Sequence, residues 1–110
     1  MIVEMRTYRL KIGMVPALMK LYQEKGLAIQ TRILGNMVGW YSTEIGAELN
    51  QIVHMWAYKD LNDRAERRAR LMQDKDWQAY AAEARTMIEH QENRILTPAP
   101  WFKPAPPAGD

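Results

Sequence analysis

The chain opens with apolar and polar residues in alternation from Val3 to Leu10, which is the pattern of a half-buried β-strand. Further strands are predicted from Asn36 to Ile45 and from Leu49 to Tyr58, where apolar and aromatic residues concentrate. The stretch Gly46-Ala47-Glu48 between them is short enough for a hairpin connection. A fourth strand is predicted from Met87 to Leu96, although its centre is unusually polar.

Two helical regions lie between these strands. Pro16 opens the first, because its missing N–H costs nothing in a first turn, and Gly26 is expected to bend or split it. Its apolar positions recur near helical spacing at Leu18, Leu21, Tyr22, Ile29 and Ile33. Asp60 or Asn62 provides the N-cap of the second region, which is interrupted at residues 74–76. The apolar face of its second part consists of Trp77, Tyr80, Ala81 and Ala84.

This order of elements, strand–helix–strand–strand–helix–strand, is that of an α+β, ferredoxin-like βαββαβ domain. Two crossovers of the same hand place both helices on one face of a four-stranded antiparallel sheet. The predicted third strand has large apolar side chains on both faces, since Val53 and Met55 alternate with Ile52 and Trp56. A second copy of the same sheet is the simplest cover for the face without helices. We therefore expect a homodimer, in the arrangement called a dimeric α+β barrel.

Composition narrows the classes of protein and partner. The chain has 110 residues, and its 15 basic and 13 acidic residues are interspersed, so we expect one domain without a nucleic-acid surface. It has no cysteine, and its two histidines lack ligand spacing, so neither a metal nor another cofactor is expected. No stretch approaches the ~20 apolar residues of a membrane span, and the first residues do not resemble a signal peptide. A cytoplasmic protein without membrane contact is the expectation.

After Thr97 the composition changes, because five of the six prolines lie between residues 98 and 107. Proline neither continues a helix nor donates to a sheet, so residues 1–97 are predicted to form the domain and residues 98–110 an extended tail. Trp101 and Phe102 in this tail either dock, for example on a partner subunit, or touch only the chain's own surface.

Four separated stretches resemble the NIPSNAP family and occur in the family's order. The first is Glu4-Met5-Arg6-Thr7-Tyr8 followed by Leu10-Lys11-Ile12-Gly13. The others are GNMVG at 35–39, NQIVHMWAY at 50–58 and QENRIL at 91–96, so the resemblance covers residues 1 to 98. It implies the dimeric α+β barrel, in agreement with the strand pattern, and a domain of undefined biochemical activity.

The parity of the strands groups polar and aromatic side chains that would line a site. Glu4, Arg6 and Tyr8 share one face of the first strand, and His54, Trp56 and Tyr58 share one face of the third, which is predicted beside it. Glu92 and Arg94 share a face of the fourth strand, on the first strand's other side, and Trp40 and Ser42 extend the set from the second. Whether the sets meet depends on strand register.

If they meet, a cleft between sheet and helices suits a small anionic or aromatic ligand, with Arg6 or Arg94 holding its charge. The candidate ligand-binding residues are Arg6, Tyr8, Trp56, Glu92 and Arg94. The alternative is a buried ionic network in which Glu4, Arg6, Glu92 and Arg94 only satisfy one another.

His54 is the candidate catalytic residue, because a histidine in a central strand has an unperturbed pKa near ~6.5, where a proton shuttle is useful. The alternative is a core histidine that shares a hydrogen bond with Tyr8, Glu4 or Glu92. His90 has the weaker claim, since the strand around it is polar.

One basic cluster lies at Arg64, Arg67, Arg68 and Arg70. Acidic residues four positions earlier, at Asp60, Asp63 and Glu66, predict a solvated, self-paired helix face. Two classes of function remain open for the chain. It binds a small molecule, with a cofactor-independent monooxygenase-like enzyme possible by fold analogy, or it is a non-catalytic scaffold for protein interactions.

Overall fold

The computed structural model describes residues 1–104. Residues 105–110, with Pro106 and Pro107 of the expected tail, lie outside the described residues. In order, the elements are β1 (Ile2–Leu10), α1 (Val15–Lys25), α2 (Leu27–Leu34), β2 (Asn36–Ser42), β3 (Gln51–Tyr58), α3 (Leu61–Gln73), α4 (Lys75–Arg85) and β4 (Ile88–Leu96).

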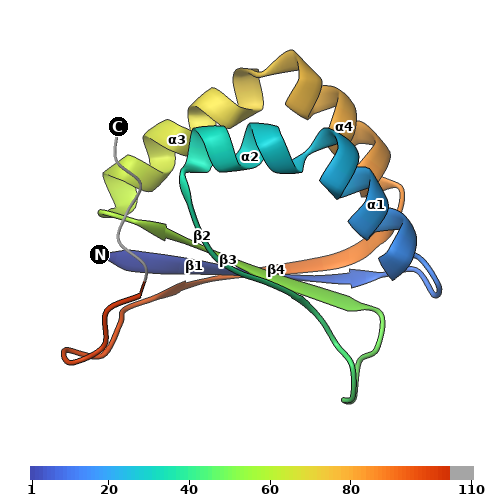
Figure 1. Cartoon of the computed structure of the whole chain (residues 1–110), viewed down its shortest axis with the longest axis horizontal. Coiled ribbons are helices and arrows are strands. Elements are labelled where there is room, and N and C mark those ends of the chain that lie inside the picture. Colours follow the sequence, from blue (N-terminus) through green and yellow to red (C-terminus); the bar gives the residue numbers. More distant parts are fainter. Residues whose placement is uncertain (105–110) are drawn as a thin grey trace.

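The strands form one antiparallel sheet in the order β2-β3-β1-β4, and the four helices lie together on one face of it (Figure 1). The α+β, ferredoxin-like βαββαβ fold predicted from the sequence is confirmed, with each predicted helical region divided in two. Among the described residues, no helix combines the length and the apolar character needed to cross a bilayer.

The breaks inside the helical regions have identifiable causes. A Cβ at Gly26 would lie 2.8 Å from Cδ1 of the Tyr22 ring and 3.2 Å from the Tyr80 ring, so the position between α1 and α2 leaves no room for a side chain next to α4. Asp74 separates α3 from α4, and its carboxylate accepts a hydrogen bond from the Trp77 N–H at 2.8 Å. Asp60 is the N-cap of α3, accepting from the Asp63 N–H at 2.8 Å.

The connection between β2 and β3 is longer than predicted. β2 ends at Ser42 and β3 begins at Gln51, so the expected strand ends at Ile45 and Leu49 belong to the loop of residues 43–50. Both side chains are exposed, Ile45 to 92%, and burial therefore gives them no reason to extend the ladder.

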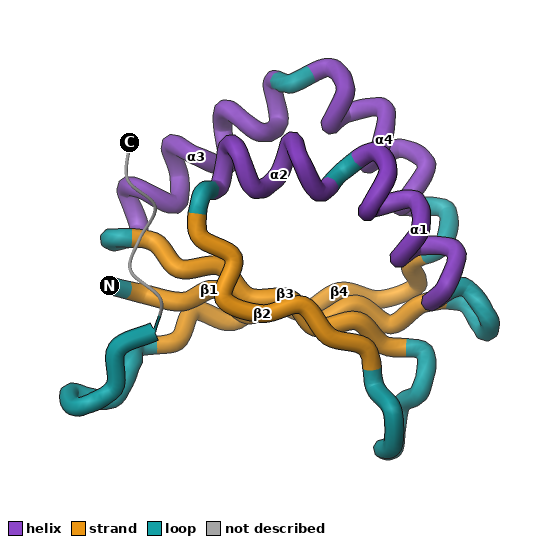
Figure 2. The backbone as a smooth tube through the Cα atoms, viewed as in Figure 1, coloured by secondary structure: helices purple, strands orange, loops and turns teal. Residues whose placement is uncertain are grey.

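The two faces of the sheet differ in what covers them. On the helix side, Leu10, Ile52, Trp56 and Tyr58 join buried helix residues in the main core. On the other face, β1 and β3 place Met5 beside Met55, and no helix of residues 1–104 covers this pair. Figure 2 shows the loop of residues 43–50 and the segment after β4 projecting from this side.

The described part of the tail turns back toward the open face. The Phe102 N–H donates to the Ala99 carbonyl at 2.9 Å, and Phe102 borders a groove with Val3 and Leu96. Trp101 remains 85% exposed. Phe102 thus lies against the chain's own surface, whereas Trp101 has no docking place on it.

Candidate functional site

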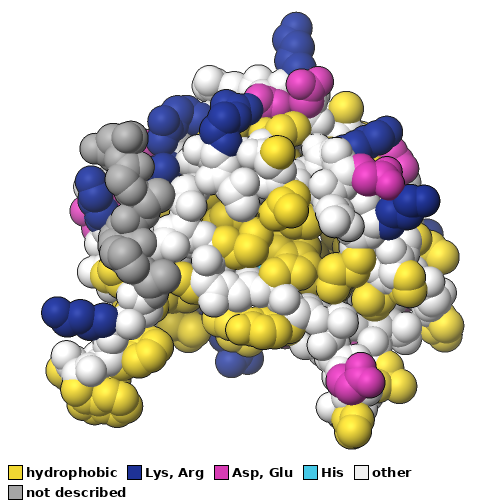
Figure 3. Space-filling view, in the orientation of Figure 1, with side chains coloured by type: hydrophobic (Ala, Val, Ile, Leu, Met, Phe, Trp, Pro, Cys, Tyr) yellow, Lys and Arg dark blue, Asp and Glu magenta, His cyan; other side chains and the backbone are white. Residues whose placement is uncertain are grey.

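A cavity of about 220 Å³ lies between the helix side of the sheet and the helix layer. Its inner wall includes the buried side chains of Tyr22, His54 and Tyr80. The exposed residues Arg85 and Gln91 also line it, so the cavity opens between α4 and the edge strand β4. In Figure 3, apolar side chains fill much of the space between the ribbon layers on the opposite, β2 side.

Strand register brings the three central candidate residues together. Arg6 on β1 pairs directly with His54 on β3, and Tyr8 follows on the same face of β1. Arg6 Nε donates to the Tyr8 hydroxyl at 2.9 Å, and the Tyr8 and His54 rings lie edge to face with centroids 5.1 Å apart. The observed register therefore brings together Arg6, Tyr8 and His54 from the faces that the strand pattern groups, and all three line the cavity.

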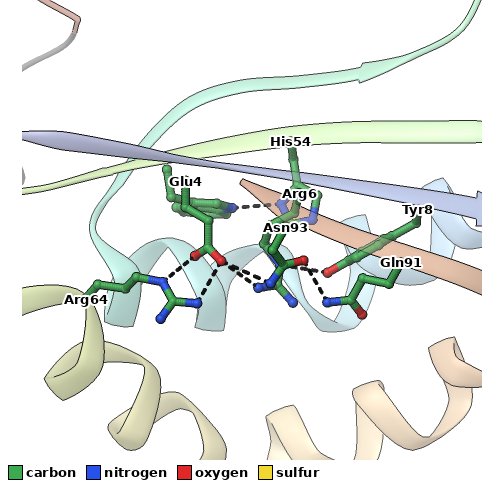
Figure 4. Close-up of polar contacts among 8 residues, drawn as sticks. Glu4, Arg6, Tyr8, His54, Arg64, Gln91 and Asn93 are labelled. Carbon is green, nitrogen blue, oxygen red and sulfur yellow. Dashed lines mark hydrogen bonds and ion pairs between the residues drawn. The ribbon is translucent and has the colours of Figure 1, made fainter. Parts of the chain in front are cut away.

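Glu4 anchors a buried ionic network next to this cluster (Figure 4). Its fully buried carboxylate accepts from Arg64 Nε at 3.0 Å and Nη2 at 2.8 Å, from Arg6 Nη1 at 3.0 Å and from Asn93 Nδ2 at 3.1 Å. Burial alone would raise the pKa of Glu4, but the hydrogen bond from Arg64 and the charges of both arginines lower it. Glu4 is therefore ionised at neutral pH.

Arg64 is the partner of Glu4, which the sequence pattern does not indicate. Helical spacing predicts a pair between Arg64 and Asp60 on a solvated face, but Asp60 caps α3, and Arg64 extends across to the sheet. Only the expected Arg67–Asp63 pair of this face is observed, at 2.9 Å. Helical spacing could indicate that Arg64 faces the sheet, because Arg64, Arg68 and the buried Leu71 lie on one side of α3.

Glu92 and Arg94 do not join the site. β4 pairs them with Thr7 and Met5, so they lie on the open face, while Gln91 and Asn93 occupy the helix side. Their predicted roles in the cleft and in its ionic network are wrong, because the register differs by one residue from the one that would place them there.

Trp56 orients His54. The indole Nε1–H donates to His54 Nδ1 at 2.7 Å, and both side chains are buried. Trp56 is thus a core residue that does not line the cavity, and none of the expected partners Tyr8, Glu4 or Glu92 bonds to the imidazole. Since Nδ1 accepts, the neutral ring carries its hydrogen on Nε2, which has no partner among the described residues.

The charge state of His54 differs from the expected one. Burial, and then the positive charges of Arg6 and Arg68, lower its pKa to about 3. The imidazole is therefore neutral at physiological pH, and proton exchange near neutrality does not fit this environment. In the resting site His54 is a fixed hydrogen-bond donor.

Aromatic side chains form much of the remaining wall. Trp40 stacks on Tyr22 with centroids 3.9 Å apart, and Tyr80 lies edge to face with Tyr22 at 5.8 Å. The Tyr22 hydroxyl donates to Gln30 at 2.6 Å, which satisfies its polar end. No cluster of three or more His, Asp or Glu residues able to hold a metal occurs within residues 1–104.

The pKa of His54 predicts that the protein loses stability in mild acid. Between pH 6.5 and about 3 the unfolded chain binds a proton at this residue and the folded chain does not. At about pH 5 the loss is about 2 kcal/mol relative to pH 7, measured as the free energy of unfolding in urea. Glu4, with its lowered pKa, adds a loss only below its ordinary value of 4.5.

His54→Asn is the control for this prediction, because its amide oxygen still accepts from Trp56 but its side chain does not titrate. The variant should lose the dependence between pH 5 and 6.5, whatever stability it loses at all pH values through its smaller side chain. A wild-type slope that persists unchanged in His54→Asn contradicts the assignment.

Fold and site together define a class: a ferredoxin-like α+β domain of the dimeric α+β barrel type, with a polar and aromatic cavity between sheet and helices. The sequence pattern of the NIPSNAP family matches residues 3–103, and the chain belongs to this family. Protein NipSnap homolog 3A from Homo sapiens is 32% identical over 101 residues, and homolog 3B is 34% identical over the same length. Each alignment covers 91% of this chain but only 40% of the human protein.

Solved structures agree with this assignment. A NIPSNAP family protein from Agrobacterium tumefaciens is 48% identical, with a TM-score of 0.89 over 92% of this chain and 88% of that one. An uncharacterized NIPSNAP-like domain protein from Burkholderia xenovorans is 38% identical, with a TM-score of 0.92 over 99% and 94%. A putative antibiotic biosynthesis monooxygenase from Nitrosomonas europaea is 16% identical, with a TM-score of 0.67 over 89% and 98%, and shares the fold.

Proposed function

We propose that the protein is a homodimeric module that binds a small anionic or aromatic molecule in the cavity between its sheet and helices. The observation that carries this proposal is His54 Nε2, a fully buried donor without a partner among the described residues, in the wall of a cavity of about 220 Å³. Buried polar groups are normally hydrogen-bonded, so a ligand acceptor at this position accounts for it.

The surroundings of His54 support a binding role. Trp56 holds the ring in one tautomer, and Arg6 and Tyr8 present further polar atoms to the same cavity. Polar groups that converge among aromatic side chains are typical of a small-molecule site. Arg6, Tyr8 and His54 are therefore the proposed contact residues, and Trp56 is a positioning residue.

The open face of the sheet supports the homodimer. Met5, Val53 and Met55 lie there half-buried, with the exposed Tyr41 beside them on β2. A contiguous apolar patch of this kind is an interaction surface, and a second copy covers it about a twofold axis. The cytoplasmic location and the domain boundary at Thr97 stay predictions.

Ligand binding is tested by filling the cavity from neighbouring positions on one helix. Ala81 lines the cavity and the exposed Ala82 does not, so Ala81→Leu reduces the space while Ala82→Leu is its matched control. Benzoate, phenol and indole are titrated against each variant, with the heat of binding measured by calorimetry as the readout. We expect at least one probe to bind the wild type and Ala82→Leu and to lose affinity for Ala81→Leu.

Two results of this titration would contradict binding in the cavity. If no probe binds the wild type in the millimolar range, which molecules of this size commonly reach in a formed pocket, the binding function is wrong. If a probe binds Ala81→Leu and the wild type equally, it binds elsewhere. The melting temperature of each variant without ligand shows that the comparison is between folded proteins.

A further inference from the structure

The charges around the cavity do not balance. Arg6, Arg68 and Arg85 line it, and no Asp or Glu among the described residues does. The nearest carboxylate, Glu4, already accepts hydrogen bonds from Arg6 and twice from Arg64. Arg68 forms no hydrogen bond or ion pair with any described residue, although it is half-buried.

A purely structural role does not explain the position of Arg68, because its charge is half-buried and has no carboxylate partner among the described residues. Burial, and then the neighbouring charge of Arg6, lower its pKa. Both arginines also act on the pKa of His54, which indicates that the three groups are close to one another. Burying a cation beside another cation costs free energy, and an anion between them removes that cost.

The hydrogen-bonding groups of this cluster are donors. His54 presents Nε2–H, and Tyr8 keeps its hydroxyl hydrogen available because its oxygen accepts from Arg6 Nε. Arg6 uses Nε and Nη1 within the chain, so Nη2 remains free of partners among the described residues. Donors that converge without an acceptor match a carboxylate, which only accepts when it is ionised.

The volume and the wall limit the remainder of the ligand. A cavity of about 150 Å³ holds one benzene ring. The cavity here, about 220 Å³, therefore has room for one ring with a small polar group. Tyr22, Trp77 and Tyr80 supply aromatic surfaces against which a planar ring packs well.

We infer that the cavity takes an aromatic monocarboxylate of one ring, with the carboxylate held between Arg68, Arg6 and the Nε2–H of His54 and the ring against the aromatic wall. This inference rests on the proposed binding function and makes it specific. Arg68 is then the residue that selects for negative charge. Arg85 at the cavity mouth adds to the positive field through which the anion enters.

Three probes distinguish the contribution of the carboxylate charge to the affinity from that of the aromatic ring. Benzoate has both, benzamide keeps the ring and the shape but is neutral, and acetate keeps only the carboxylate. Dissociation constants are measured by calorimetry for the wild type, for Arg68→Gln and for Arg70→Gln. Arg70 is exposed on the same helix outside the cavity, so its replacement changes the net charge equally.

We expect benzoate to bind the wild type about tenfold more tightly than either benzamide or acetate. Arg68→Gln should weaken benzoate about tenfold or more and leave benzamide unchanged, whereas Arg70→Gln should alter neither by more than about twofold. His54→Asn, which removes the Nε2–H but keeps an acceptor for Trp56, should also weaken benzoate.

Stability gives a second readout that a structural role would move in the opposite direction. Without ligand, Arg68→Gln should melt at the same temperature as the wild type or higher, because it removes a half-buried cation that lacks a partner among the described residues. If the variant is instead less stable and binds benzoate like the wild type, Arg68 is structural and the inference is wrong.

The inference and the binding function fail in different ways. Equal affinities for benzoate and benzamide that Ala81→Leu reduces together leave the cavity as a binding site and overturn its selection for carboxylates. Failure of all ring-bearing probes, including phenol and indole, to bind the wild type overturns both.

Discussion

Replacing Glu4 by glutamine is expected to lower the free energy of unfolding by about 3–5 kcal/mol, because the change leaves the buried Arg6 and the half-buried Arg64 without their carboxylate. Glu4 is fully buried, and its four accepted hydrogen bonds connect β1 to α3 and to β4. A neutral amide matches the shape of the carboxylate but neutralises neither Arg6 nor Arg64. Urea unfolding at pH 7 and a fixed protein concentration measures the loss.

The exposed ion pair between Arg32 and Asp74, at 3.4 Å, provides the comparison. Arg32→Gln should cost less than about 1 kcal/mol, since solvated pairs contribute little. The double variant Glu4→Gln/Arg6→Met should recover part of the loss, because it also removes one of the stranded charges. A loss below about 1 kcal/mol for Glu4→Gln would show that the network is dispensable.

The central part of the site could be predicted because neighbouring strands share a simple geometry. Side chains alternate between faces along each strand, and the βαββαβ order places β3 beside β1. The core residues Leu10 on β1 and Ile52 and Trp56 on β3 mark the inner side of each strand, so only registers that keep these sides inward are possible. Arg6, Tyr8 and His54 therefore meet in the observed register.

β4 lacked that constraint. Its two faces carry Gln91 and Asn93 on one side and Glu92 and Arg94 on the other, so both are polar and neither identifies itself as the inner one. The register of such a strand is set by contacts with residues that are distant in the sequence, and the pattern along the strand does not reveal them. Here one of these contacts is the hydrogen bond from Asn93 to Glu4.

The contacts of the α3 arginines do not follow from the sequence for a related reason. Asp60 and Arg64 have the spacing of a helical ion pair, but Asp60 is also a favourable N-cap residue. In the structure its carboxylate accepts from the Asp63 N–H and caps the helix. An arginine side chain is long enough to reach the sheet, and a buried carboxylate there offers stronger bonds than a solvated one. Propensity and spacing along one helix do not reveal such a competitor.

The other prediction with a large expected effect concerns the open face of the sheet. Met55 on β3 lies half-buried beside Met5 on that face, at the centre of the surface proposed to meet a second copy. Met55→Asp introduces a carboxylate that would lose its hydration in the dimer, at a cost of several kcal/mol. We expect sedimentation to show dissociation to monomers at concentrations at which the wild type remains dimeric.

Stability should follow assembly, because a homodimer gains stability with protein concentration by mass action. The melting temperature of the wild type is therefore expected to rise with concentration, and that of Met55→Asp to be lower and independent of it. Leu61→Asp is the matched control, since Leu61 is an apolar residue, 59% exposed, in the first turn of α3 in the helix layer, where an acidic side chain is favourable. A Met55→Asp protein that sediments as a dimer with the wild-type melting curve would assign the dimer to another surface and leave the apolar sheet face unexplained.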